Sequence, residues 1–489
     1  MEAALPPSNR AAASLRAKIR SAVIWRSGSQ IVAQLVQWAA TFLVIRILQP
    51  ADYGLYAMTG VVLAFLNLLN GYSLASGLIR AATITTREVR QLFGMLLLLN
   101  AVLAAIQFAA APLVAGFYRQ PEVATMLRVQ CLLYLFTPFI ALPYALLARE
   151  MDFARQARVN IVAALAGAAA ALGGALAGWG VWTLVWAPIV LFAVRALGMT
   201  WAARALVWPS FRFAGAGALA RFGGLMATAQ LFWFAQTQAD VLIAGRFFDA
   251  ASVGLYTTAL FLTQIFQNKV VPPLNEVAFS AYARLQDQPG AVGRAFVGSA
   301  GAIMAAALPV YLGMAATAEP LVLLALGEQW AGAVPAVQVL ACAMPFMTLY
   351  VLMPPATDAI GQPGIGVRAS MIGAVVLPLA CAVGVQWGLT GLAAAWLVAW
   401  PVMLAVLGRR ALPAIGVGAR ELARALAPAV QAAVAMAAVV LLVDRMLPPI
   451  ASAARLGVLV AAGACVYAGW MLIFSRPTVR ALWTMIRTR

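Results

Sequence analysis

Apolar runs of about 20 residues recur along this chain, and they restrict its possible folds more than any other feature. An α-helix of that length crosses the hydrocarbon of a bilayer with every backbone polar group satisfied inside the segment. Hydrophobic residues make up 64% of the 489 positions and charged residues only 10%. We therefore predict an all-α integral membrane protein with about fourteen transmembrane helices. The predicted spans cover residues 29–48, 54–77, 92–115, 128–148, 158–178, 181–203, 223–246, 253–274, 295–316, 334–354, 368–388, 390–408, 425–443 and 456–475.

The distribution of basic residues predicts the orientation of these spans. In a soluble protein the net charge of +18 would suggest nucleic acid as a partner. In a membrane protein, Lys and Arg gather in the cytoplasmic segments instead. Most of the 33 basic residues fall on one side when the N-terminus is cytoplasmic. We expect both termini in the cytoplasm and no nucleic-acid partner.

Cysteine and histidine limit the chemistry that the chain can support. The four cysteines stand singly in apolar runs, and the sequence contains no histidine. A disulfide framework or a Cys/His metal site needs these residues in clusters. We therefore expect no metal and no cofactor.

A repeat divides the chain into two halves. The pattern of an Arg, seven residues and Gly-Leu-Tyr occurs at Arg46 and again, 200 residues later, at Arg246. Six predicted spans separate the two copies, so both have the same orientation, as in the parallel repeats of secondary transporters. We predict these domains: 1–27, a cytoplasmic basic segment; 28–212, an N-lobe with helices 1–6; 213–411, a C-lobe with helices 7–12; 412–476, helices 13–14; and 477–489, a cytoplasmic tail.

The residues of the two copies have an expected structural role at the lobe junctions. Gly54 and Gly254 could supply tight junctions between loop and helix, because glycine tolerates unusual backbone angles. Tyr56 and Tyr256 fit the aromatic belt at the membrane interface. Arg46 and Arg246 would then be interface anchors.

Several motifs follow one another from about residue 25 to about residue 410. They are Arg46-Ile-Leu-Gln-Pro50-Ala-Asp52-Tyr53-Gly54-Leu-Tyr56, Leu147-Ala-Arg149-Glu-Met-Asp152-Phe153, Gly178-Trp-Gly180-Val-Trp182, Asp240-Val-Leu-Ile-Ala-Gly245-Arg246, Phe279-Ser-Ala-Tyr-Ala-Arg284 and Gly327-Glu328-Gln-Trp330. In order and spacing they resemble the Wzx-type O-antigen and exopolysaccharide flippases of the MOP superfamily. One departure is Gly361-Gln362, where that family has Gly-Arg.

This resemblance implies an architecture and a function. The architecture is two six-helix lobes in parallel repeat around a central cavity, followed by two C-terminal helices. The function is that of a transporter and not an enzyme. Such a flippase carries polyprenyl-diphosphate-linked oligosaccharide from the cytoplasmic to the periplasmic leaflet of the bacterial inner membrane by alternating access. The expected partners are that glycan lipid, the membrane lipids and a polysaccharide polymerase.

The first span carries a polar stripe. Spacings of three and four residues place its polar side chains on one helical face. A diphosphate and sugars need a polar, cationic path through the membrane, which predicts that this face lines a wet cavity and binds substrate. The alternative is a hydrogen-bonding seam between helices, with the arginine reaching the surface. The stripe consists of Arg26, Gln30, Gln34, Gln37 and Thr41.

Two further spans carry ionisable residues. Arg195 lies in the sixth span without an acidic neighbour at helical spacing, so it either binds a substrate anion or extends towards the cytoplasm. In the seventh span, Asp240 shares a face with Gln230 and Thr237. A buried carboxylate could bind and release a coupling ion. The alternative, slightly favoured from sequence, is a structural ion pair with an arginine.

The eighth span combines polar residues with two prolines. Gln267 and Lys269 precede Pro272-Pro273, and Glu276 follows them. A proline pair kinks or ends a helix. The sequence therefore predicts either a kinked, polar helix that binds substrate and serves as a gate, or a helix that ends at the cytoplasmic surface near Lys269.

Three other functions compete with the flippase interpretation. A MATE-like ion-coupled multidrug exporter would need an acidic pocket for cationic drugs, whereas the candidate residues here are mostly basic or amide. A membrane-embedded enzyme would need a catalytic constellation, and the longest segments between spans are only about 20 residues. An anion channel or a structural membrane protein is less compatible with the two-lobe repeat.

Overall fold

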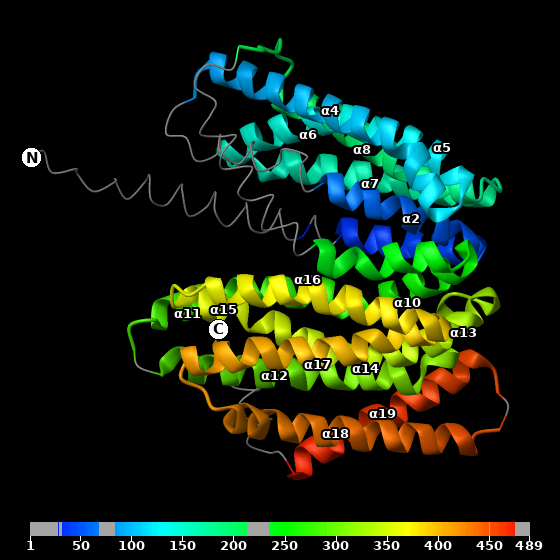
Figure 1. Ribbon diagram of the computed structural model, residues 1–489, viewed down its shortest axis with the longest axis vertical. Helices are drawn as coiled ribbons and strands as arrows, with labels where there is room; N and C mark the ends of the chain where they lie inside the picture. The colour runs from blue at the N-terminus through cyan, green and yellow to red at the C-terminus, as the bar shows by residue number, and fades with distance from the viewer. Residues whose placement is uncertain are drawn as a thin grey trace, which may run out of the picture. The chain divides into compact units, whose positions relative to one another are not determined.

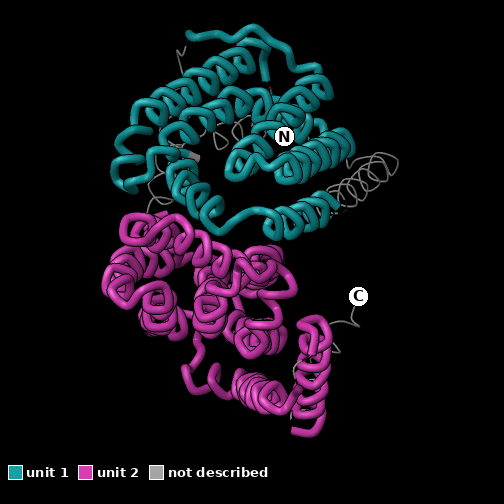
Figure 2. The backbone as a smooth tube through the Cα atoms, turned by 90° about the vertical axis from the view of Figure 1, so that its right-hand side faces the viewer, with its two compact units in different colours: residues 1–231 teal, residues 232–489 magenta. Residues whose placement is uncertain are grey.

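The computed structural model describes residue 28 and residues 32–67, 84–212, 234–288, 290–448 and 450–474. Within these residues the chain is helical and contains no strand (Figure 1). It divides into two compact units, residues 1–231 and residues 232–489 (Figure 2).

In unit 1, the helix Val32–Ile47 precedes α2. Its longest helix, α4, starts with a complete capping box, in which the side chains of Thr85 and Glu88 each accept a hydrogen bond from the other residue's backbone N–H. The remaining helices follow after short connections. Its labelled helices are α2 (Pro50–Asn67), α4 (Thr86–Tyr118), α5 (Pro121–Gln130), α6 (Leu132–Arg149), α7 (Phe153–Leu176) and α8 (Val181–Ala203).

Unit 2 repeats this order and adds two helices at its end. A helix over the described residues 234–247 precedes α10. Its other α-helices are α10 (Ala250–Lys269), α11 (Val271–Leu285), α12 (Ala291–Ala316), α13 (Ala318–Ala325), α14 (Val334–Leu352), α15 (Pro354–Ala359), α16 (Gly364–Gly384), α17 (Gly388–Ala414), α18 (Ala419–Met446) and α19 (Ser452–Phe474). Two short 3-10 helices, η1 (Glu328–Ala333) and η2 (Val385–Trp387), complete the unit.

The helices agree with the predicted spans and identify the chain as a multi-pass membrane protein. Nine helical segments within the described residues are long and apolar enough to cross a membrane, and two shorter apolar helices, Val32–Ile47 and Pro50–Leu66, add to them. The apolar run at 319–330 forms the short helix α13 and the start of η1, and not a plain loop. Its counterpart α5 was missed from sequence, because Glu122 and Arg128 interrupt the apolar pattern there.

The two copies of the repeat keep the same helix boundaries. The helices before the junction end at residues 47 and 247, and the next helices begin at Pro50 and Ala250. Gly54 and Gly254 are therefore the fifth residues of α2 and α10. The prediction that they form junctions between loop and helix was wrong, because each helix starts before its glycine. Both glycines are buried inside their helices.

The same junction is stabilised differently in the two copies. Before α2, the Gln49 backbone N–H donates to Oδ2 of Asp52 at 3.0 Å. Before α10, Oδ1 of Asp249 accepts from the Ser252 backbone N–H at 3.3 Å. A capping box consists of both bonds. Each copy therefore holds one half of it.

The motifs of the junctions pack on glycine-containing turns of the same unit. A Cβ atom on Gly180, where φ is +54°, would lie 3.2 Å from Oδ1 of Asp52. A Cβ atom on Gly332 of η1 would lie 2.8 Å from Cδ1 of Leu255. Motifs far apart in sequence are thus in contact at one end of each unit.

At the opposite end of unit 1, the segment 205–212, here called the strap, crosses the start of α4. The Ser210 backbone N–H donates to the Arg90 carbonyl at 2.9 Å, and Arg90 Nε donates to the Trp208 carbonyl at 3.0 Å. A Cβ atom on Gly94 would lie only 2.3 Å from the Ser210 carbonyl oxygen. The strap therefore requires glycine at position 94.

Unit 2 contains an equivalent crossing. The chain leaving α17 passes the first turn of α12, and a Cβ atom on Gly293 would lie 2.4 Å from the Ile415 carbonyl oxygen and 2.7 Å from Cγ2 of Val417. Gly94 and Gly293 occupy corresponding helices of the two units. The repeat thus extends to a feature that the sequence comparison did not reveal.

Ion pairs and a hydrogen bond attach the last two helices to each other and to the rest of unit 2. Arg455 of α19 donates to both carboxylate oxygens of Asp444 on α18, at 2.7 and 2.9 Å. It also pairs with Glu319 of α13 at 3.0 Å. Farther along α19, the Tyr467 hydroxyl donates to the Ala305 carbonyl of α12 at 2.7 Å.

Candidate functional site

The polar stripe of the first span is described only in part. Arg26 and Gln30 lie outside the described residues. In the helix Val32–Ile47, Gln34 is half-buried and Gln37 is exposed. The spacing of these two amides on a continuous helix agrees with a shared face, and their contact with substrate stays a prediction.

Arg195 lies well inside α8, eight positions before its last residue, Ala203. Its side chain is half-buried, and its buried Nε makes no hydrogen bond to any described residue. A buried guanidinium N–H without a partner costs free energy unless a ligand or water accepts from it. The geometry therefore leaves a donor available for an anion at this position.

Gln267 and Lys269 have different surroundings, although they are two residues apart at the end of α10. Lys269 is exposed. Gln267 is buried, and its Oε1 accepts from the Thr348 hydroxyl of α14 at 3.0 Å. The Tyr311 hydroxyl of α12 lies 3.1 Å from the same Thr348 hydroxyl. Gln267 thus links three helices of unit 2, and it fixes the end of α10 from which Lys269 extends.

The proline pair lies in the first turn of α11, directly after the end of α10. α10 ends at Lys269, and α11 begins two residues later at Val271. Asn275 secures the new helix by donating to the Val351 carbonyl at 3.0 Å. α10 therefore ends at Lys269, and a second helix, α11, follows the turn at Val270. Substrate binding and gating by this part of the chain stay predictions, as does the place of Lys269 at the cytoplasmic surface.

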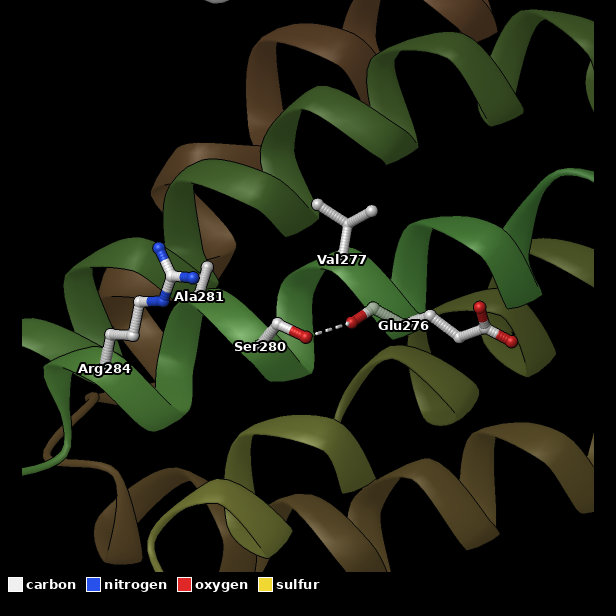
Figure 3. Close-up of a pocket in the computed structure, with 5 residues that line it drawn as sticks. All are labelled: Glu276, Val277, Ser280, Ala281 and Arg284. Atoms are coloured by element: carbon white, nitrogen blue, oxygen red, sulfur yellow. Dashed lines mark hydrogen bonds between the residues drawn. The ribbon is translucent and has the colours of Figure 1, made fainter. Parts of the chain in front are cut away.

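One face of α11 lines an open hollow of about 470 Å³. Figure 3 shows the carboxylate of Glu276 and the guanidinium of Arg284 extending in different directions, with Ser280 between them. The Ser280 hydroxyl donates to the Glu276 backbone carbonyl at 3.1 Å. Neither charged side chain makes an ion pair with a described residue. Sequence reasoning noted Arg284 only as part of a motif, although its spacing of eight residues from Glu276 indicates a shared face.

Asp240 lies in the interior of unit 2, where only 1% of its surface is exposed. Its Oδ2 accepts from the Tyr256 hydroxyl at 3.0 Å, and its Oδ1 accepts from the Val241 backbone N–H at 2.8 Å. The Trp396 indole of α17 lies close to the same carboxyl group. Among the described residues no arginine pairs with Asp240, whose carboxylate is held by Tyr256 and Val241, and the structural ion pair favoured from sequence stays a prediction.

The tyrosines of the repeat also differ from expectation. Tyr256 is completely buried inside the unit, where its hydroxyl donates a hydrogen bond to Asp240. Its assignment to the aromatic belt was wrong. Tyr56 is half-buried in α2. Arg46 and Arg246 lie at the last turns of the helices that precede the two junctions, with Arg46 exposed and Arg246 half-buried.

Residues 43–335 match the model of a family described as "Polysaccharide biosynthesis protein". The succinoglycan biosynthesis transport protein ExoT of Rhizobium meliloti (strain 1021) is 27% identical over 352 residues, which cover 72% of this chain and 71% of that protein. The lipopolysaccharide biosynthesis protein WzxC of Escherichia coli (strain K12) is 23% identical over 329 residues, which cover 67% of each chain.

Solved structures show the same fold at low sequence identity. The lipid II flippase MurJ in an inward closed conformation matches with a TM-score of 0.76 and 11% identity, and the match covers 93% of this chain and all of that chain. An inward-facing multidrug resistance MATE transporter of the MOP superfamily matches with a TM-score of 0.59 and 14% identity, covering 80% of this chain and 98% of that chain. The predicted fold class is thereby confirmed.

Proposed function

Because the chain belongs to this family of polysaccharide biosynthesis proteins, we propose that it is a flippase for polyprenyl-diphosphate-linked oligosaccharide. It would move the repeat unit from the cytoplasmic to the periplasmic leaflet by alternating access. The names of ExoT and WzxC, which refer to polysaccharide transport and lipopolysaccharide biosynthesis, support this proposal. The match to a lipid II flippase supports a fold that suits such transport.

The substrate determines which side chains are needed. A diphosphate and a chain of sugars must cross about 30 Å of hydrocarbon. Arginine and lysine compensate the phosphate charge, and arginine can donate to two oxygens at once. Amide side chains exchange hydrogen bonds with sugar hydroxyls. The lipid tail can stay in the bilayer throughout.

The observation that carries the proposal is the buried guanidinium Nε of Arg195. An arginine within a membrane helix is costly unless it faces water, a partner or a ligand. Its buried Nε has no hydrogen-bond partner among the described residues. We assign Arg195 to the diphosphate, together with Arg26 and Lys269. The amides Gln30, Gln34 and Gln37 would contact sugars, and Gln267 would hold the end of α10 in position.

The hollow on α11 extends this assignment to unit 2. Arg284 supplies a cation for phosphate, and Ser280 and Glu276 supply groups that accept hydrogen bonds from sugar hydroxyls. Eight residues of helix separate the two charges by about 12 Å. That length suits a phosphate together with one or two sugar rings.

Asp240 is our candidate for ion coupling. A buried carboxylate held by a tyrosine hydroxyl can exchange that bond for a bound cation when the surrounding helices move. The Asp240→Asn variant, which keeps the shape but not the charge, is expected to fold and to lose the dependence of transport on an ion gradient. Transport by this variant that still follows a proton or sodium gradient would exclude the coupling role.

The setting proposed for this activity is the bacterial inner membrane, with both termini in the cytoplasm. The excess of basic residues in one set of loops supports that orientation. A polysaccharide polymerase that uses the translocated units would be a partner on the periplasmic side.

Flipping can be tested with purified protein in liposomes that contain a polyprenyl-diphosphate oligosaccharide. A glycan-modifying enzyme that cannot cross the bilayer reports how much glycan reaches the outer leaflet. We expect the wild type to expose glycan from the inner leaflet. Arg195→Ala should slow this by about tenfold or more, because a hydrogen bond to a charged group is worth about 1.5–3 kcal/mol.

Arg158→Ala is the matched control, because Arg158 is an exposed arginine on the neighbouring helix α7. Its transport rate should equal that of the wild type. Equal rates for Arg195→Ala and wild type would contradict the assignment of Arg195. Protein that moves no glycan but exports cationic drugs would replace the flippase proposal with the multidrug exporter.

A further inference from the structure

The strap over residues 205–212 alternates between buried and exposed side chains. Ala205 is buried, and Val207 packs on the cluster formed by Val89, Leu92 and Phe93. The residues between and after them point outwards: Leu206 is 84% exposed and Trp208 is 83% exposed. An extended segment places successive side chains on opposite sides. One side of the strap therefore covers α4, and the other presents two large apolar side chains.

The end of α8 continues this apolar surface. Trp201 is 85% exposed and Leu197 is 73% exposed, and their spacing of four residues places them on one face of the helix. Large apolar groups at such exposure are costly in water, and a tryptophan combines an apolar ring with an N–H donor. Such residues gather at the boundary between lipid headgroups and acyl chains.

Two arginines flank the apolar side chains. Arg204 caps α8 in the left-handed conformation, with φ of 48°. Arg212 ends the described strap, where its carbonyl accepts from Gln91 Nε2 at 2.6 Å. Both side chains are exposed, and neither makes an ion pair with a described residue.

Two of the carboxylates at this end of unit 1 already have partners. Glu88 accepts both from the backbone N–H and from the hydroxyl of Thr85, at 2.7 and 2.9 Å. Asp152 pairs with Arg155 at 3.1 Å, and the same arginine donates to the Ala202 carbonyl at the end of α8. Arg204 and Arg212 therefore give this surface an excess of positive charge.

We propose that this strap surface, formed by Leu197, Trp201, Arg204, Leu206, Trp208 and Arg212, binds an anionic phospholipid. The apolar side chains would enter the acyl boundary, and the two guanidinium groups would bind the phosphate and the other anionic groups of the headgroup. The hydrogen bonds of the strap to Arg90 and Gln91 hold these groups in a fixed arrangement before lipid binds. The site does not depend on the identity of the transported substrate.

Purified full-length protein in bilayers of phosphatidylethanolamine, with and without phosphatidylglycerol, provides the test. Native mass spectrometry would count the phosphatidylglycerol molecules that stay bound. Arg204→Gln combined with Arg212→Gln should weaken this retention by about fivefold for each arginine. The matched control is Arg119→Gln combined with Arg128→Gln. Arg119 is also a C-cap arginine in the left-handed conformation, but it lies at the other end of α4.

A second readout tests the apolar part of the surface without changing its charge. Lipids with brominated acyl chains quench the fluorescence of nearby tryptophans. Trp208→Phe should remove more of the quenchable emission than Trp400→Phe, because the Trp400 side chain is fully buried in unit 2. The proposal is supported if only the Arg204→Gln and Arg212→Gln double variant loses phosphatidylglycerol and if Trp208→Phe removes more quenchable emission than Trp400→Phe. Equal retention by the two double variants, or equal quenching after the two tryptophan substitutions, would overturn it.

Discussion

The Tyr256 hydroxyl donates a hydrogen bond of 3.0 Å to Oδ2 of Asp240, and both side chains are buried in unit 2. The residues lie on consecutive helices and come from different motifs of the sequence. In unit 1 the corresponding positions hold Ala40 and Tyr56, so the repeat provides the tyrosine without the carboxylate. The hydrogen-bonded pair is therefore specific to unit 2.

Tyr256→Phe should destabilise the protein by about 1–3 kcal/mol, because it leaves a buried carboxylate oxygen without its donor. Thermal unfolding in detergent would show a lower melting temperature. Tyr56→Phe is the matched control, since its hydroxyl makes no hydrogen bond to a described residue. Equal melting temperatures for the two variants would show that the hydrogen bond between Tyr256 and Asp240 does not contribute to stability.

Gly94→Ala should be destabilising by about 1–3 kcal/mol, since the new methyl group would collide with the strap backbone at Ser210. Gly116→Ala in the same helix meets no atom within 4 Å, and should raise stability slightly through better helix propensity. Gly293 and Gly301 offer a similar comparison in α12, where a Cβ atom on Gly301 would meet only the Ala425 carbonyl oxygen, at 3.9 Å. Melting temperatures that rank the two members of either pair in the opposite order would contradict the close approach.

Arg455→Gln should weaken the attachment of α19, because it removes the two hydrogen bonds to the Asp444 carboxylate and the ion pair with Glu319. Hydrogen exchange should increase in α19, while α14 stays protected. Arg445→Gln is the control, because Arg445 is exposed and makes no ion pair with a described residue. The expected loss of stability is about 1 kcal/mol, since these groups are partly in contact with solvent.

Arg284→Gln should reduce the rate of glycan flipping several-fold without lowering the melting temperature, because its side chain lines the hollow and supports no fold contact among the described residues. The control is Arg294→Gln, because Arg294 is an exposed arginine at the start of α12. A lower melting temperature with an unchanged flipping rate would assign Arg284 a structural role instead.

The membrane helices could be predicted from sequence because their signal is strong and local. A run of about 20 apolar residues has few alternative structures. The parallel repeat could also be predicted, since two arginines and two Gly-Leu-Tyr triplets mark it with a constant offset. The helix α5 was missed because Glu122 and Arg128 make its composition resemble a loop.

The contacts inside the units could not be predicted, because they depend on packing between distant segments. Asp240 had several candidate cations in the sequence, yet its partner is a tyrosine from the next helix. The sequence of the strap does not alternate between apolar and polar residues, and its course is defined by Gly94, which is one of 39 glycines. The sequence predicts that the Gln267 amide binds substrate, but its Oε1 accepts a hydrogen bond from the Thr348 hydroxyl.

The two half-capped junctions explain how a duplicated chain can lose its sequence likeness and keep its geometry. A helix start with two reciprocal hydrogen bonds tolerates the loss of either one, because the other still fixes the first turn. Asp52 preserves the start of α2, and Asp249 preserves the start of α10. The two copies could therefore diverge by opposite substitutions, without any shift of the helices that follow. Either bond alone is thus enough for the same helix start in both copies, at Pro50 and at Ala250.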